Sequence, residues 1–347
     1  LATPTDGPIP PSKDPWYMCP PSDWESQKPG TILKHRMTPG KIVLRYQGIE
    51  FQPPKAYNIL YRTTDSNHKP SWAASTVIFP ANDDSSKPIS AIMSYQHPYD
   101  SADVDQSPSY SIYTNALLQQ ALIGYILKGW VVNIPDYEGP KAAFGAGAQS
   151  GHATLDSVRA ILGATQIIRN LNRDTKYAMY GYSGGSFATE WAAELQTQYA
   201  PELKFSGAGI GGAFPNIANT IQKLSNNEAL SGHLRNAIVG IGNENLYAQT
   251  VAMSILNKSS WSEVNKTVLD PSSMPFTQLQ SFVGQVLQSP AISNILKRDG
   301  MMGYHGVPQM PLLVHRHDAD QLSDTADTTK LVDEFCSVGA NIYYHIN

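Results

Sequence analysis

The sequence predicts an α/β fold: a mostly parallel β-sheet with helices on both faces and a helical cap inserted towards the carboxyl-terminal end. Short apolar runs alternate with segments of helical periodicity before Gly212 and after Gly306, a pattern typical of parallel sheets covered by helices. Between these positions the alternation stops and only helical patterns remain. A Gly-x-Ser-x-Gly motif also falls where a predicted strand meets a predicted helix.

The predicted strands are short apolar runs, some of which end at glycine or proline. They cover residues 90–95, 129–136, 176–181, 205–212, 310–315 and 341–346. The sequence therefore predicts a sheet whose strands are separated by longer helical segments.

The predicted helices carry apolar side chains three or four residues apart. Thr154 is expected to cap the helix over residues 154–171, and Gly339 is expected to end the last helix. The other core helices cover 186–199 and 328–338, and those of the cap cover 215–224, 234–256, 276–289 and 291–300. We expect a proline-rich segment over 1–40 that packs on the core, a core over 41–212 and 307–347, and a cap or lid over 213–306.

The serine motif reads Gly181-Tyr182-Ser183-Gly184-Gly185. A strand that runs directly into a helix forces Ser183 into a tight turn, and the glycines remove side chains that would clash there. The helix amino terminus behind the hydroxyl favours developing negative charge. The alternative is a glycine-rich turn with a capping serine, but this context predicts that Ser183 is a nucleophile.

Composition excludes several classes of function. The 347 residues are 41% hydrophobic and 16% charged, enough to bury a large core. A net charge of −4 with no basic cluster gives no electrostatic footprint for nucleic acid. The apolar run over 116–127 is too short and too interrupted by polar residues to span a bilayer.

Two acceptor sequences for N-glycosylation begin at Asn257 and Asn265 and favour a secreted, extracellular protein. Cys19 and Cys336 are too few for a disulfide framework or a zinc site. They either pair with each other, or one pairs with a residue outside this sequence.

Five stretches resemble the fungal secretory lipase family, the α/β-hydrolases related to lipase A of Candida antarctica. These are IPDYEGPKAAFGAGAQSGHATLDSVRA, YGYSGGSFATEWAAELQTQYAPEL, GAGIGGAFPNI, GYHGVPQMPLLV and DTTKLVDEFCSVGANI. The resemblance implies an α/β-hydrolase fold and hydrolysis of carboxylic esters by a Ser-Asp-His triad, with no metal and no cofactor. It implies a small-molecule or lipid ester as substrate, transient contact with a lipid interface through the cap, and no obligate protein partner.

The acid of the triad is expected just after the strand over 310–315, because the chain order in this fold is serine, acid, histidine. Resemblance to the family pattern assigns Asp320, and a slip of two residues in the alignment would assign Asp318 instead. Asp327 is expected to cap the following helix, a common role for aspartate.

The histidine of the triad is expected just beyond residue 347, by resemblance to the family's spacing. His345 lies within the last predicted strand, and His315 and His317 come too early in the chain order. We expect structural or surface roles for these three side chains.

The oxyanion hole needs hydrogen-bond donors aimed at the substrate oxygen as it becomes negative. The N–H group of Gly184, directly after the nucleophile, is one expected donor. Resemblance assigns the other to Asp100, which must be protonated or must act through its backbone, since a carboxylate would repel the oxyanion. Asp100 could instead be a turn residue that binds its own backbone.

Three functions are compatible with these features. The first is a secreted lipase or esterase that forms an acyl-serine intermediate. The second is an esterase for a small ester, such as an acetyl group on a fungal secondary metabolite like a trichothecene. The third is a binding protein that kept the hydrolase fold but lost catalysis.

Overall fold

A nine-stranded sheet forms the centre of the computed structural model, which describes residues 7–80, 88–168, 170–172, 174–320 and 322–347. The strands of this sheet are β1 (Ile32–Met37), β4 (Ala56–Thr64), β5 (Pro70–Ile78), β6 (Ala91–Gln96), β7 (Val131–Pro135), β8 (Lys176–Tyr182), β9 (Ala208–Gly211), β10 (Leu312–Arg316) and β11 (Ile342–Ile346). A separate two-stranded sheet pairs β2 (Leu44–Tyr46) with β3 (Ile49–Phe51).

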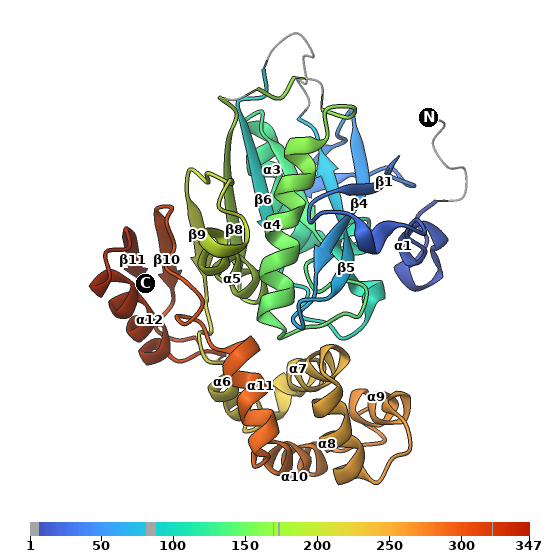
Figure 1. The fold of residues 1–347 in the computed structure, drawn as a ribbon, viewed down its shortest axis with the longest axis vertical. Coiled ribbons are helices and arrows are strands. Elements are labelled where there is room, and N and C mark those ends of the chain that lie inside the picture. Colours follow the sequence, from blue (N-terminus) through green and yellow to red (C-terminus); the bar gives the residue numbers. More distant parts are fainter. Residues whose placement is uncertain (1–6, 81–87, 169, 173, 321) are drawn as a thin grey trace.

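The order of the large sheet is β1-β4-β5-β7-β6-β8-β9-β10-β11 (Figure 1). Neighbours from β7 to β11 run parallel, whereas β1, β4, β5 and β7 are joined by antiparallel pairing. The mostly parallel sheet predicted from the sequence is confirmed. The antiparallel strands β1, β4 and β5 are an addition, since no strand was predicted before residue 90.

Helices cover both faces of the sheet. On one face, α4 (Gly147–Gly163), α5 (Gly184–Tyr199) and α12 (Thr325–Ser337) share a buried cluster with β8, β9 and β10. On the other face, α3 (Ala116–Leu127) packs against β5, β6 and β7. In β6, Ile92 joins the cluster that contains α4, while the next residue, Met93, joins the cluster that contains α3. This is the alternation that a strand buried on both faces requires.

Helix α4 corrects the predicted helix over 154–171. It begins seven residues earlier, at Gly147, and ends at Gly163, so Thr154 is buried inside the helix and caps nothing. The early turns carry glycine because they pass close to α5: a Cβ atom on Gly147 would lie 2.0 Å from the Trp191 ring. Tertiary packing therefore outweighs the low helix propensity of this stretch.

The chain leaves the sheet after β9 and builds a group of helices, which gather below the sheet in Figure 1. They are α6 (Ile217–Leu224), α7 (Ser231–Glu244), α8 (Leu246–Leu256), α9 (Trp261–Leu269), α10 (Phe276–Leu287) and α11 (Pro290–Gly300). The single helix predicted over 234–256 is wrong: Asn245 is extended and its side chain accepts hydrogen bonds from the N–H groups of Tyr247 and Ala248, which starts α8 afresh.

Short elements fill the remaining connections. They are η1 (Pro11–Lys13), α1 (Pro15–Met18), η2 (Trp24–Ser26), η3 (Val104–Gln106), α2 (Pro108–Ser111) and η4 (Glu228–Leu230). The segment before β1 contacts the sheet through Trp72, whose indole N–H donates to Tyr17 O at 3.0 Å. Within the described residues, no helix is both long and apolar enough to cross a membrane.

Candidate active site

Ser183 lies between the end of β8 and the start of α5, so the predicted strand–turn–helix junction is confirmed. Its backbone has φ 54° and ψ −124°, a strained conformation for a residue other than glycine. Backbone hydrogen bonds hold it: Ser183 N–H donates to Gly211 O at 2.8 Å, and Ser183 O accepts from Ser186 N–H at 2.8 Å and from Phe187 N–H at 3.2 Å. The turn therefore depends on β9 as well as on its own helix.

The glycines of the motif allow three close contacts. A Cβ atom on Gly181 would lie 2.0 Å from Gly185 O, and one on Gly185 would lie 1.9 Å from Gln96 O. A Cβ atom on Gly184 would lie 1.7 Å from the Asp100 Oδ1 atom. The turn at Ser183 thus packs directly against the loop that follows β6.

Asp100 belongs to that loop and is itself strained, with φ 46°. Its Oδ1 atom is buried and makes no hydrogen bond to the residues that the structure describes. Burial raises the pKa of the Asp100 carboxyl from 3.8 to about 7. The carboxyl therefore keeps its proton to much higher pH than an ordinary aspartate, and it lies against Gly184.

Aromatic side chains hold the Asp100 loop in place. The Tyr137 hydroxyl donates to His97 O at 2.8 Å, and Glu138 N–H donates to the Tyr99 hydroxyl at 2.7 Å. These residues were not predicted as part of the site. Their position in the sequence could have indicated them, because Tyr137 and Glu138 directly follow β7. In a parallel sheet β7 ends at the same edge as β6, so residues just after it lie near the Asp100 loop.

Asp320 lies in the turn after β10, at the same edge of the sheet. Its Oδ1 atom accepts from Leu322 N–H at 2.8 Å and from Ser323 N–H at 3.3 Å, and its Oδ2 atom accepts from the Ser323 hydroxyl at 3.2 Å. The Asp320 side chain is 14% exposed, whereas Asp318 is exposed. Of the two predicted candidates, only Asp320 is held in a fixed orientation by these contacts.

The predicted cap at Asp327 is wrong. Helix α12 begins at Thr325, and Asp324 caps it by accepting from Ala326 N–H at 3.0 Å. Asp327 instead lies in the first turn and accepts from the Asn219 side chain of α6 at 2.9 Å. The helix starts three residues earlier than predicted, because the Asp324 side chain caps it and leaves Asp327 inside its first turn.

The histidines near Asp320 have other contacts. His315 hydrogen-bonds with the Tyr180 hydroxyl at 2.9 Å and pairs in register with His345 across β10 and β11. Burial lowers the pKa of His315. The His317 ring accepts from Ala319 N–H at 3.0 Å. Within the described residues, no hydrogen bond joins the Asp320 carboxylate to a histidine ring.

A narrow pocket of about 30 Å³ opens beside Ser183. Its lining residues come from the core and from α6 and α7: Asp100, Phe144, Ser183, Phe214, Ile217, Thr220, Ile221, Leu224, His233, Ala237 and Leu322. The wall is mostly apolar, so it suits the apolar parts of a ligand whose reactive group lies at Ser183.

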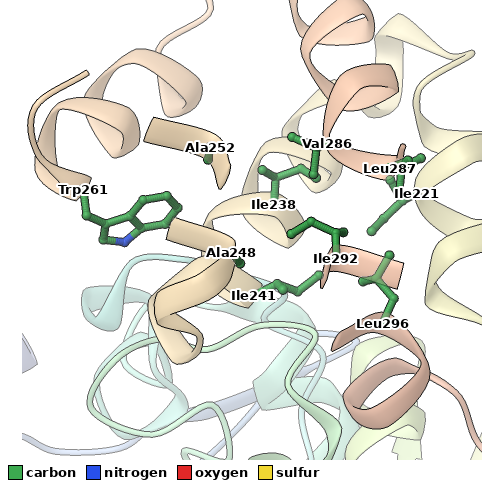
Figure 2. Close-up of a pocket in the computed structure, with 10 residues that line it drawn as sticks. All are labelled: Ile221, Ile238, Ile241, Ala248, Ala252, Trp261, Val286, Leu287, Ile292 and Leu296. Atoms are coloured by element: carbon green, nitrogen blue, oxygen red, sulfur yellow. The ribbon is translucent and has the colours of Figure 1, made fainter. Parts of the chain in front are cut away.

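A second, narrow pocket of about 20 Å³ lies among the helices below the sheet and is lined only by apolar and aromatic side chains (Figure 2). Ile221 lines both pockets. The side chain of Ile221 therefore stands between the space beside Ser183 and an apolar space inside the helical group.

The two candidate glycosylation sites differ in their surroundings. Asn257 is exposed and ends α8 in a left-handed conformation. Asn265 is half-buried within α9, and its side-chain nitrogen is 3.4 Å from Asn243 Oδ1. Cys19 and Cys336 are both free and exposed, so they do not pair with each other.

Comparison with known proteins gives consistent matches. Residues 109–347 match the model of a family described as secretory lipase. The chain is 41% identical to a trichothecene C-3 esterase of Fusarium sporotrichioides, over 98% of this chain and 79% of that protein. It is 33% identical to a lipase A of Arthroderma benhamiae, over 98% of this chain and 75% of that one.

Among solved structures, Candida antarctica lipase A in its closed state matches with a TM-score of 0.80 and 27% sequence identity. The match covers 97% of this chain and 81% of that one. The predicted α/β-hydrolase fold is confirmed.

Proposed function

Since the chain belongs to the secretory lipase family and is an ester-hydrolysing enzyme, we propose that it cleaves carboxylic esters through an acyl intermediate on Ser183. The observation that carries this proposal is the strained turn at Ser183, packed against a buried carboxyl and open to an apolar pocket. The alternative of a non-catalytic binding protein is not retained, because the relatives are named as lipases and esterases.

In this proposal, Ser183 Oγ attacks the ester carbonyl carbon while its proton passes to a histidine base. The carbonyl oxygen becomes negative and accepts hydrogen bonds from Gly184 N–H and from Asp100. The base then gives its proton to the leaving alcohol, and the acyl group stays on Ser183. Water, deprotonated by the same base, adds to the acyl carbon, and the carboxylic acid leaves as Ser183 regains its proton.

The base is proposed to be a histidine that follows residue 347, oriented by Asp320. Asn347 N–H donates to Arg316 O at 3.0 Å, and Asn347 O accepts from Asp318 N–H at 3.1 Å. The backbone at Asn347 therefore runs beside the turn that carries Asp320. A histidine supplied by the next few residues would lie near the Asp320 carboxylate.

Replacing Ser183 with alanine removes the proposed nucleophile and is expected to lower kcat by about 10⁴-fold or more. The measurement is hydrolysis of p-nitrophenyl acetate and butyrate by protein that carries the residues following 347. Ser272→Ala is the control, because this serine lies in the exposed turn between α9 and α10, outside the site. Wild-type rates in the Ser183→Ala protein would contradict the assignment.

Replacing Asp320 with asparagine keeps the shape of the turn but removes the charge that holds the tautomer of the base. We expect kcat to fall by about 10⁴-fold. Asp318→Asn, two residues away and exposed, should have a much smaller effect. If Asp318→Asn lowered kcat more than Asp320→Asn did, Asp318 would be the residue that orients the base.

The oxyanion proposal predicts a pH dependence. Asp100 donates a hydrogen bond only while protonated, so its contribution is present below a pKa of about 7 and is lost as the pH rises through that value. In Asp100→Asn the amide donates at every pH, so this alkaline decline in kcat should disappear. A flat wild-type profile from pH 6 to 9 would mean that the Asp100 carboxyl is not a donor.

Two classes of ester substrate are compatible with the site. The apolar lining of the space behind Ile221 (Figure 2) supports a lipase with an apolar acyl chain. The 41% identity to a protein named as a trichothecene C-3 esterase supports the second candidate, an esterase for a small acyl group on a bulky alcohol. We propose lipase or esterase activity as the main function. In this proposal the acyl chain extends from Ser183 past the side chain of Ile221.

Acyl chain length separates these candidates. Each methylene buried behind Ile221 should add about 0.8 kcal/mol, so kcat/KM should rise from acetate until the pocket is full. The measurement is a series of p-nitrophenyl esters from acetate to palmitate below their micellar concentrations. Ile221→Phe should narrow the passage and shift the optimum to shorter chains. A steep fall beyond propionate in the wild type would leave the small-ester function.

Secretion and contact with lipid complete the proposal. The family is described as secretory, and Asn257 offers an exposed site for glycosylation. Leu246 and Tyr247, at the start of α8, are 75% and 72% exposed. These two side chains support transient contact of the cap with a lipid surface.

A further inference from the structure

The two proposed donors to the carbonyl oxygen of the substrate belong to different elements. Gly184 is the first residue of α5, whereas Asp100 lies in the loop that follows β6. An oxyanion hole works only if its donors keep a fixed separation, because both are aimed at one oxygen atom. The residues that join α5 to the end of β6 therefore determine how well the site holds the oxyanion.

A buried chain of hydrogen bonds joins these two elements. The Thr189 hydroxyl of α5 lies 2.8 Å from Gly185 O and 2.8 Å from the side-chain amide of Gln96, the last residue of β6. Both Thr189 and Gln96 are fully buried. A Cβ atom on Gly181 would lie 2.6 Å from Thr189 Oγ1, so the first glycine of the motif leaves room for this hydroxyl.

The direction of these hydrogen bonds follows from the hydrogens available. Thr189 Oγ1 carries one hydrogen and Gly185 O can only accept, so the hydroxyl donates to Gly185 O. The Gln96 amide must then turn its nitrogen towards Thr189. In this orientation the amide oxygen accepts from the Ser94 hydroxyl at 2.8 Å, and the nitrogen lies 3.2 Å from Tyr180 O. Each polar atom of the two side chains thus has a partner, which fixes a single geometry.

We propose that Gln96 and Thr189 are positioning residues that set the distance between the Gly184 N–H donor and the Asp100 loop. A threonine hydroxyl that bonds an earlier carbonyl group of its own helix is common, and alone it concerns only that helix. Here the same hydroxyl also binds Gln96, which leads into the Asp100 loop. The inference rests on the proposed function, because it takes the oxyanion to form beside Ser183.

Thr189→Val keeps the shape of the side chain and removes its hydroxyl, so α5 and β6 lose this link. The assay uses p-nitrophenyl butyrate and protein that carries the residues following 347. We expect kcat to fall by about 10- to 100-fold, the effect of a small displacement of catalytic groups. KM should not change, because Thr189 lies outside the pocket lining. Thr189→Ser keeps the hydroxyl and should restore kcat.

A pair of ketones separates positioning from a general loss of stability. The Ser183 oxygen adds to the carbonyl carbon of butyl trifluoromethyl ketone, the serine proton passes to the base, and the ketone oxygen becomes an oxyanion. Butyl methyl ketone instead binds as the uncharged ketone. In Thr189→Val the Ki of the trifluoromethyl ketone should rise by the factor by which kcat/KM falls, while the Ki of the methyl ketone stays constant.

Gln96→Met removes the other end of the link. Because the two side chains act as one unit, this variant should lower kcat by a similar factor, and the double variant should lose no more than Thr189→Val alone. Ser150→Ala is the matched control on α4, since its buried hydroxyl also bonds a carbonyl of its own helix, Ala146 O, at 3.0 Å. Its kcat and both Ki values should equal those of the wild type.

Wild-type kcat and Ki values in Thr189→Val would overturn the inference and leave the proposed function intact. An equal rise in both Ki values would also overturn it, because the pocket rather than the oxyanion site would then have changed. Additive losses in the double variant would show that Gln96 and Thr189 act separately, which contradicts the inference. Wild-type hydrolysis by Ser183→Ala would instead contradict the proposed function itself.

Discussion

The close approach of the β8–α5 turn to its neighbours is the constraint on which the rest of the site depends. Backbone strain of the kind seen at Ser183 costs on the order of 1–3 kcal/mol and persists only where the surroundings fix it. Here the surroundings are Gln96 O, which leaves no room for a side chain on Gly185, and Gly211 O, which accepts from Ser183 N–H. The Ser183 turn, the Asp100 loop and the end of β9 are thus held together.

The same contacts extend to the turn that carries Asp320 and to the helices that follow β9. Directly after Gly211, Gly212 N–H donates to His315 O at 3.0 Å, close to the turn that holds Asp320. Behind Ser183, Phe187 and Trp191 of α5 belong to the buried cluster that runs through α6 to α11. Helix α5 therefore positions Ser183 and also packs against the helices that line the pocket. A change in the packing of α5 should affect both Ser183 and the pocket.

The sequence was sufficient for the parts of the fold in which local signals agree. Glycines around Ser183 and an apolar strand before it predicted the turn, and the repeat of Phe187 and Trp191 predicted α5. The sequence failed where distant packing decides the structure. Helix α4 begins at Gly147 because α5 lies close to it, and β4 and β5 are buried along nearly their whole length, so they lack the alternation that marks a strand with one exposed face.

The insertion of the cap between β9 and β10 has a consequence for folding. These strands are parallel neighbours, with Leu312 paired to Ala208, yet roughly a hundred residues separate them along the chain. Closing a flexible loop of that length costs about 4 kcal/mol of chain entropy, whereas a loop already shortened by its own helices costs less. The cap should therefore fold before β10 joins the sheet, and destabilising its helices should slow refolding more than it speeds unfolding. The Glu194 side chain of α5 accepts from His305 N–H at 2.8 Å. This contact then holds the segment between α11 and β10 against the core.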